Sequence, residues 1–172
     1  MSKSELNQVV SEPISDSIVT TWLFNGSYIG DDKIPKTAQF FIYKIKHIET
    51  GKWYIGRKTL FSTKTKQVKG KKKKYKVESD WKTYWSSSDK LQTWIAESKE
   101  EHFVREILIF VDTAAACMYA EEWALYFTGA LFDPLCMNEN IRAKIMRKWF
   151  MNKEKDLHTR LAALHLNTNT PG

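Results

Sequence analysis

Four side chains in the first third of the chain are suited to binding phosphate. Tyr43 and Tyr54 carry phenols, and Arg57 and Lys58 follow shortly after the second of them. A phenol can orient water or exchange a proton, and a guanidinium offers a planar pair of donors to phosphate oxygens. Two phenols and two cations on one small element would suit the binding and cleavage of a phosphodiester.

The acid–base role of these tyrosines is open from the sequence. Free tyrosine titrates near ~10, so Tyr43 or Tyr54 could act as a general base only if Arg57, Lys58 or a metal lowered that pKa. The sequence does not distinguish the two phenols. The alternative is that one or both only orient water or pack in the core, where a buried phenol still finds a hydrogen-bond partner.

The stretch Phe40–Thr59 must position these residues, and its pattern predicts a β-hairpin. Phe41, Tyr43 and Ile45 alternate with Ile42 and Lys44, as in a strand with two faces. A Thr-Gly turn follows and leads into Trp-Tyr-Ile-Gly, because glycine allows the connection to take positive φ. We expect Tyr43 and Tyr54 to lie roughly opposite each other in the two arms.

A basic segment follows the hairpin. Residues 50–77 hold 11 of the chain's 27 Lys and Arg residues and none of its 20 Asp and Glu residues, so the rest of the chain is net acidic. Such a local charge indicates a polyanionic partner, although a solvated loop is the plainer alternative. Residues 61–79 are predicted to form a mobile loop that makes non-specific phosphate contacts. The lysines expected to contact nucleic acid are Lys58, Lys64, Lys71, Lys72, Lys73 and Lys74.

The next segment carries signals for a helix and then a strand. Ser88 or Asp89 is placed to cap a helix that ends near Glu100, because apolar residues recur at the spacing of one helical face. Phe103–Val111 is rich in branched and aromatic residues, which predicts a buried strand. Arg105 and Glu106 are expected to be a surface pair or edge charges of this strand.

Helices are predicted for most of the remaining chain. Asp112 or Thr113 should cap a long helix that continues through Phe127. A basic helix and then an amphipathic helix are expected after Asn138. Their defining residues are Arg142, Lys144, Arg147 and Lys148 in the first, and Leu157, Leu161 and Leu164 in the second.

The order of these elements predicts an α+β fold, with a small three-stranded antiparallel sheet flanked by helices. We expect a domain at 38–145 that includes the basic loop 61–79. An N-terminal extension, residues 1–37, precedes it, and a C-terminal helical tail, residues 146–172, follows it. Two cysteines and four histidines give no disulfide framework and no zinc spacing. No run of about 20 apolar residues is present, so an intracellular protein is expected.

The long helix and the loop after it hold further candidate residues. The helix is mostly apolar, so at least one of Glu121 and Glu122 should approach the inner side, where a carboxylate requires a cation. An exposed helix glutamate is the alternative. Asn138 taken alone is most simply a loop residue that caps the following helix.

Several of these motifs, in this order, resemble the GIY-YIG nuclease superfamily. Phe41-Ile42-Tyr43 stands in place of the first signature motif, and Tyr54-Ile55-Gly56 matches the second. The resemblance continues through Phe103-Val104-Arg105-Glu106-Ile107-Leu108 to Asn138-Glu139-Asn140-Ile141. It covers about residues 40–144 and is nearest to phage-encoded free-standing and homing-type endonucleases.

The resemblance implies metal-dependent hydrolysis of DNA phosphodiesters in the bacterial or phage-infected cytoplasm. Tyr43 and Tyr54 match the two motif tyrosines, and Arg57 is the best match for a residue that steadies the phosphate. Glu122 would bind one divalent cation, Mg²⁺ or Mn²⁺, and Asn138 matches the asparagine that closes the site. For Mg²⁺ a single carboxylate is sufficient protein ligation, because the ion keeps several waters.

Three departures from the family pattern keep other functions open. The first glycine of the opening motif is Phe41, the Arg and His that many members carry beyond the second motif are absent, and Glu121 competes with Glu122 for the acidic position. A catalytically inactive nucleic-acid-binding protein of the same fold is therefore the first alternative. A protein whose basic loop binds an acidic partner protein is the second.

Overall fold

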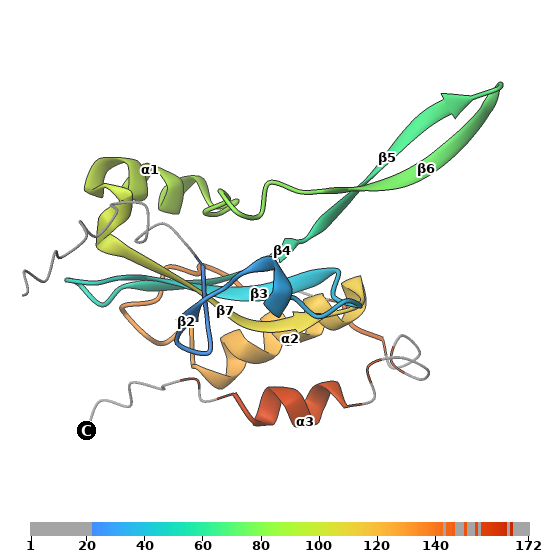
Figure 1. Cartoon of the computed structure of the whole chain (residues 1–172). Coiled ribbons are helices and arrows are strands. Elements are labelled where there is room, and N and C mark those ends of the chain that lie inside the picture. The colour runs from blue at the N-terminus through green and yellow to red at the C-terminus, as the bar shows by residue number, and fades with distance from the viewer. Residues whose placement is uncertain are drawn as a thin grey trace, which may run out of the picture.

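The computed structural model describes residues 22–142, 144–146, 150, 154, 156–164 and 166. Two layers of helix enclose one sheet, and a two-stranded arm projects away from it (Figure 1). The elements in chain order are β1 Leu23–Phe24, β2 Ser27–Tyr28, a 3₁₀ turn Asp31–Lys33, β3 Phe40–His47, β4 Trp53–Thr59, β5 Phe61–Val68, β6 Lys71–Glu78, α1 Asp89–Ser98, a 3₁₀ turn Glu100–His102, β7 Phe103–Val111, α2 Ala114–Phe127 and α3 Leu157–Ala162.

The main sheet has five strands in the order β2-β1-β7-β3-β4, so the three-stranded prediction was too small. The predicted antiparallel strands β7, β3 and β4 are neighbours in this sheet, with β4 at one edge, and β1 adds to β7 in parallel. The added strands β1 and β2 lie within residues 23–28, in the segment expected to be an extension. Trp22 is buried, and Asn25 and Gly26 take positive φ in the turn that joins β1 to β2.

The two faces of β3 follow the alternation seen in the sequence. Phe41, Tyr43 and Ile45 face the core under α1, whereas Ile42 faces the core under α2 and α3. Phe41, which replaces a glycine of the family motif, is fully buried and packs edge-on against Trp22. An irregularity between β3 and β7 at Ile42/Tyr43 shifts their pairing by one residue.

The predicted boundaries of helices α1 and α2 are confirmed to within two residues. Ser88 caps α1, its hydroxyl accepting from the Leu91 N–H, and Thr113 caps α2 by accepting from the Ala116 N–H. Helix α2 ends at Phe127, as predicted. Among its described residues, the protein has no helix long and apolar enough to cross a membrane.

The predicted loop 61–79 is instead an antiparallel ribbon of β5 and β6. Its strands pair from Phe61↔Glu78 to Val68↔Lys71, and Lys69 and Gly70 form the connecting turn with φ of 48° and 76°. A two-residue turn with positive φ at both positions matches the twist of a hairpin. The abundance of lysine obscured this signal in the sequence.

The C-terminal region differs in part from the prediction. The structure assigns no helix to residues 141–142 and 144–146, where a basic helix was expected, and Arg147 and Lys148 lie outside the described residues. The predicted amphipathic helix is α3, with Leu157 and Leu161 buried against the α2 side of the sheet. Residues 1–21 and 167–172 also lie outside the described residues.

Candidate active site

The two signature tyrosines lie on one face of the β3–β4 hairpin, diagonally rather than directly opposite. Tyr43 pairs with Gly56 and Tyr54 pairs with Ile45, and the ring centroids of the two tyrosines are 6.3 Å apart. The ring of Tyr43 crosses directly over Gly56. A Cβ at position 56 would lie 2.5 Å from the Tyr43 hydroxyl and 2.8 Å from a ring carbon of Tyr54. Glycine is therefore required at this position by the packing of both phenols.

Burial keeps both phenols protonated in the free protein. The pKa of Tyr43 is raised well above its usual value, mainly by burial, and Tyr43 is 1% exposed. The pKa of Tyr54 is also raised, again mainly by burial. The condition for a general-base tyrosine, a phenol pKa lowered by Arg57 or Lys58, is not met in the protein alone, because desolvation dominates.

The segment between β6 and α1 supplies residues that the sequence analysis did not place in the site. Ser86 is 2% exposed and hydrogen-bonds to both Tyr43 and Tyr54. Tyr84 packs edge-on against Tyr43 with ring centroids 6.1 Å apart. The run Trp81–Ser88 was the available signal, because it holds three aromatic residues and three consecutive serines.

Arg105 holds this segment in place and is not the surface charge that was expected. Its side chain is 2% exposed, and its guanidinium carbon lies 4.6 Å from the ring centre of Trp22 and 4.3 Å from that of Trp85. Its Nη1 donates to the Tyr84 carbonyl oxygen at 2.7 Å. Burial lowers the pKa of Arg105 to about 10, which leaves it charged at neutral pH.

Arg57 faces helix α2 across the edge of the sheet. Its Nε lies 3.2 Å from Oε2 of Glu121, and its side chain is about half exposed while that of Glu121 is largely covered. Burial raises the pKa of Glu121 to about 6, although Arg57 acts in the opposite direction. Glu121 thus shares the site with the hairpin residues, and it also raises the pKa of Tyr54.

Glu122 lies beside Glu121, and both glutamates line a cavity next to the hairpin. It is 8% exposed, its pKa is raised by burial, and the Arg142 backbone donates a hydrogen bond to it. The cavity has a volume of about 250 Å³. Its polar lining includes Tyr54, Glu121, Glu122, Asn138 and Arg142.

Asn138 ties the loop after α2 to the hairpin. Its Oδ1 accepts from the Ile55 N–H at 2.9 Å, and its Nδ2 donates to the Ile55 carbonyl oxygen at 2.7 Å. Both halves of the amide are therefore engaged by the backbone of β4. Asn138 closes one wall of the cavity by this bridge, and the described residues that follow it, 139–142 and 144–146, form no helix for it to cap.

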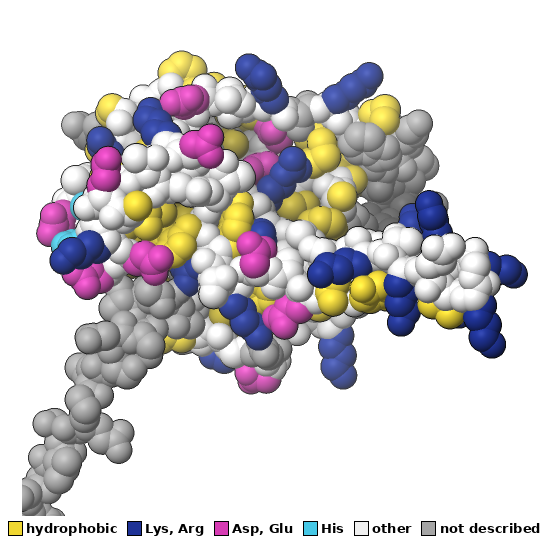
Figure 2. Space-filling view, turned by 90° about the horizontal axis from the view of Figure 1, so that it is seen from above, with side chains coloured by type: hydrophobic (Ala, Val, Ile, Leu, Met, Phe, Trp, Pro, Cys, Tyr) yellow, Lys and Arg dark blue, Asp and Glu magenta, His cyan; other side chains and the backbone are white. Residues whose placement is uncertain are grey.

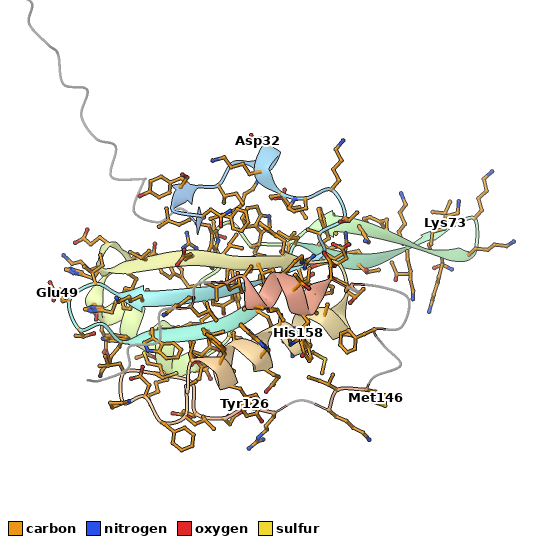
Figure 3. All side chains as sticks on the ribbon, turned by 90° about the horizontal axis from the view of Figure 1, so that it is seen from below. Asp32, Glu49, Lys73, Tyr126, Met146 and His158 are labelled. Atoms are coloured by element: carbon orange, nitrogen blue, oxygen red, sulfur yellow. The ribbon has the colours of Figure 1, made fainter. Side chains whose placement is uncertain are left out.

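The lysines predicted to contact nucleic acid fall in two places. Lys58 is within the body, where its Nζ is 2.5 Å from Oδ1 of Asp80 and 3.7 Å from the ring centre of Tyr84. The other lysines lie on the arm, well away from the cavity, as the label of Lys73 illustrates (Figure 3). These are Lys64, Lys71, Lys72, Lys73 and Lys74.

The residues around the cavity fit one divalent ion that keeps much of its water. Within the described part of the chain, no three His, Cys, Asp or Glu side chains cluster as a metal site. Mg²⁺ does not need such a cage, because one or two carboxylates with several waters satisfy it. Glu121 and Glu122 are two carboxylates on one cavity wall, each disfavoured as a bare anion by burial.

A sheet that sets two tyrosines against a glutamate-bearing helix is the arrangement of a GIY-YIG nuclease domain. A family model described as "Putative endonuclease segE, GIY-YIG domain" matches residues 22–142 of the chain. The chain belongs to this endonuclease family, and the resemblance to the GIY-YIG superfamily is confirmed. Comparison with curated proteins and with solved structures gives no match.

Proposed function

We propose that this protein is a metal-dependent DNA endonuclease of the GIY-YIG type, acting in the cytoplasm of a bacterial or phage-infected cell. The observation that carries the proposal is the cavity shared by Tyr54 from the hairpin and the adjacent glutamates of α2, beside Arg57. The family membership supports the endonuclease class. Beyond that class, we propose the metal, the DNA substrate and the role of each site residue.

Arg57 and Lys58 would bind the phosphodiester from the hairpin side. The planar guanidinium of Arg57 is half exposed and can turn from Glu121 to phosphate oxygens. Lys58 is held over Tyr84 and by Asp80, so it contributes a fixed positive charge more than a mobile contact. Together they would hold the substrate against the mouth of the cavity.

Tyr43 and Tyr54 would enter the reaction as protonated phenols, that is, as hydrogen-bond donors. Ser86 links them, and their raised pKa values keep the O–H groups available as donors to water or to phosphate oxygens. Tyr54 borders the cavity and is the better placed of the two to reach substrate. Tyr43 is buried and would orient Tyr54 through Ser86.

The glutamates of α2 would hold the ion. When bound, a divalent ion supplies Lewis-acid stabilisation of the phosphate and lowers the pKa of a bound water. Spacing along the sequence favours Glu122 as the ligand, whereas the 3.2 Å contact to Arg57 favours Glu121. We propose that both carboxylates face the ion, with Glu121 the more important because it adjoins the phosphate-binding residue.

Cleavage of supercoiled plasmid with Mg²⁺ tests this proposal with Glu121→Gln, Glu122→Gln and the double variant. Glutamine keeps the shape of the side chain and removes its charge. We expect the double variant to lose cleavage by about 10³-fold or more, in line with loss of a charge-stabilising group. Glu121→Gln should lose more than Glu122→Gln, and the reverse order would return the main ligand role to Glu122. Equal cleavage by wild type and the double variant would overturn the proposal.

Two observations favour a second function, an inactive DNA-binding protein of the same fold. The pKa of each phenol is raised, which disfavours a role as general base, and the guanidinium of Arg57 is paired with Glu121. Salt-dependent DNA binding without cleavage by the wild type under Mg²⁺ or Mn²⁺ would support that function over the first.

A further inference from the structure

The ribbon of β5 and β6, Phe61–Glu78, concentrates positive charge on an exposed arm. It carries eight lysines and one acidic residue, Glu78, at its base. Figure 2 shows lysine side chains projecting from the arm in several directions. All side chains at positions 63–67 and 71–76 are exposed. The arm therefore presents charge to a partner and does not cover the core.

The pairing register gives the ribbon two chemically different faces. Residues that pair directly across the two strands share a face. One face has Thr63, Thr65 and Gln67 on β5 beside Lys76, Lys74 and Lys72 on β6. The other face has Ser62, Lys64, Lys66 and Val68 beside Val77, Tyr75, Lys73 and Lys71. The first face thus carries a row of neutral hydrogen-bonding groups next to a row of cations.

The arm lacks the stabilisation that a hairpin usually gains from burial. An isolated two-stranded hairpin is marginal in water, and like charges directly opposite each other are unfavourable. Lys66 and Lys73 form such an opposed pair. A polyanion would relieve this repulsion, which favours a nucleic acid or another acidic surface as the partner.

The dimensions of the ribbon favour the major groove of duplex DNA. A groove about 12 Å wide admits a two-stranded ribbon, and eight residues per strand reach about 26 Å. Threonine and glutamine can hydrogen-bond base edges there, and lysines beside them can reach phosphates. A single strand has no groove of this width, and an acidic protein presents no base edges to the row of polar side chains.

The base of the arm is joined directly to the strand that carries candidate active-site residues. Only Leu60, which is buried, separates β5 from the strand that carries Arg57 and Lys58. Ser79 Oγ donates to the Thr59 carbonyl oxygen at 2.6 Å, so both ends of the arm are fixed to β4. Bases contacted by the arm would lie within about one helical turn of the phosphate at the cavity.

We infer that the β5–β6 ribbon is a recognition arm that lies in the major groove of duplex DNA beside the cleaved phosphate. The face with Thr63, Thr65 and Gln67 contacts base edges, and the neighbouring lysines contact phosphates. This inference rests on the proposed function for the choice of DNA as partner. It adds a separate recognition element that the sequence did not reveal.

The test compares two sets of ribbon variants of the full chain for DNA binding without divalent ion, so that cleavage plays no part. The first set is Thr63→Val, Thr65→Val and Gln67→Met, which keeps the shapes and removes the hydrogen bonds. With a pool of randomised duplexes, wild type should enrich a preferred sequence and this variant should lose at least 10-fold of that preference while keeping its non-specific affinity.

The second set is Lys72→Gln with Lys74→Gln, on the same face. We expect weaker binding to every duplex and a salt dependence reduced by about 2 in log–log slope, since each phosphate contact contributes about 0.9. A duplex methylated at guanine N7, in the major groove, should weaken wild-type binding, whereas a minor-groove ligand should not compete. Unchanged melting of both variants shows that the body stays folded.

Several results would overturn the inference. They are equal selection by wild type and the threonine–glutamine variant, insensitivity to N7 methylation, or tighter binding of single-stranded RNA or of an acidic peptide than of duplex DNA. Loss of cleavage in the glutamate variants with normal ribbon-variant binding would leave the endonuclease proposal intact and reject the arm. Sequence-selective binding by a protein that never cleaves would do the opposite.

Discussion

The candidate active site and the ribbon both contain cationic side chains, but these have partners within the protein in the site and extend into solvent in the ribbon. In the site, Arg57 is engaged by Glu121, Lys58 by Asp80, and Arg105 by two tryptophans and a carbonyl. In the ribbon, lysines extend into solvent from both faces. The site is thus organised before substrate arrives, while the ribbon has charge available for a partner. Substitutions in the two regions should have different consequences.

The largest expected effect is from Gly56→Ala. The new Cβ would lie 2.5 Å from the buried Tyr43 hydroxyl, so the phenol or the β3–β4 pairing must move. We expect a loss of about 1–3 kcal/mol in the free energy of unfolding, as for overpacking of a core, together with strongly reduced cleavage. Urea unfolding measures the first and plasmid cleavage the second.

A matched control is Gly70→Ala in the ribbon turn. Nothing lies within 4 Å of a Cβ there, although its φ of 76° still disfavours alanine. This change should strain only the turn and leave the unfolding of the body unaltered. Since Gly56 does not have a positive φ, an unchanged unfolding free energy for Gly56→Ala would show that Tyr43 moves away from the new Cβ at little cost.

Asn138→Ala comes next in size. It removes the acceptor of the Ile55 N–H and the donor to the Ile55 carbonyl, leaving two backbone groups of β4 without these partners. We expect about 2 kcal/mol of destabilisation, measured by urea unfolding. Asn138→Asp keeps the acceptor but sets a carboxylate oxygen against the Ile55 carbonyl oxygen, so it should be no less damaging. Full stability of Asn138→Ala with loss of cleavage would indicate a direct role in chemistry instead.

The pH dependence of stability should identify the buried carboxylate of Glu121. Its pKa is about 6 in the folded protein and about 4.5 when exposed, so the folded state binds more protons between these values. Stability should therefore fall as pH rises from about 4.5 to 6 and then level off. In Glu121→Gln the fall should be smaller by about 1 kcal/mol, as judged by thermal melting at each pH. An identical pH profile for the two proteins would argue against a buried, charged Glu121.

The smallest expected effect on folding is in the ribbon. Lys73→Thr removes the repulsion with Lys66 and should change the free energy of unfolding of the body by less than about 0.5 kcal/mol. Hydrogen exchange should report slightly slower exchange of the ribbon amides, since one unfavourable cross-strand pair is gone. A cooperative loss of body stability would mean that the ribbon is part of the folding core.

Local patterns in the sequence determined the hairpin, the two capped helices and the buried strand. These patterns are the alternation of side chains in Phe40–His47, the Thr-Gly turn, and the hydroxyl caps at Ser88 and Thr113. Each involves only a few neighbouring residues, so it can be recognised without knowledge of the tertiary structure. The ribbon was also encoded locally, in alternating threonine and lysine and a Lys-Gly turn. It was missed because a run of lysines resembles a disordered segment.

Tertiary structure alone decided the contacts that complete the site. Glu121 meets Arg57, and Asn138 bridges Ile55 across 83 positions of sequence. Arg105 was interpreted as a surface charge because no local pattern shows that Trp22 and Trp85 enclose it. Whether a polar side chain is buried depends on what packs against it from distant segments. Short-range periodicity therefore specifies strands and helices, and only their packing specifies which charges and amides come together.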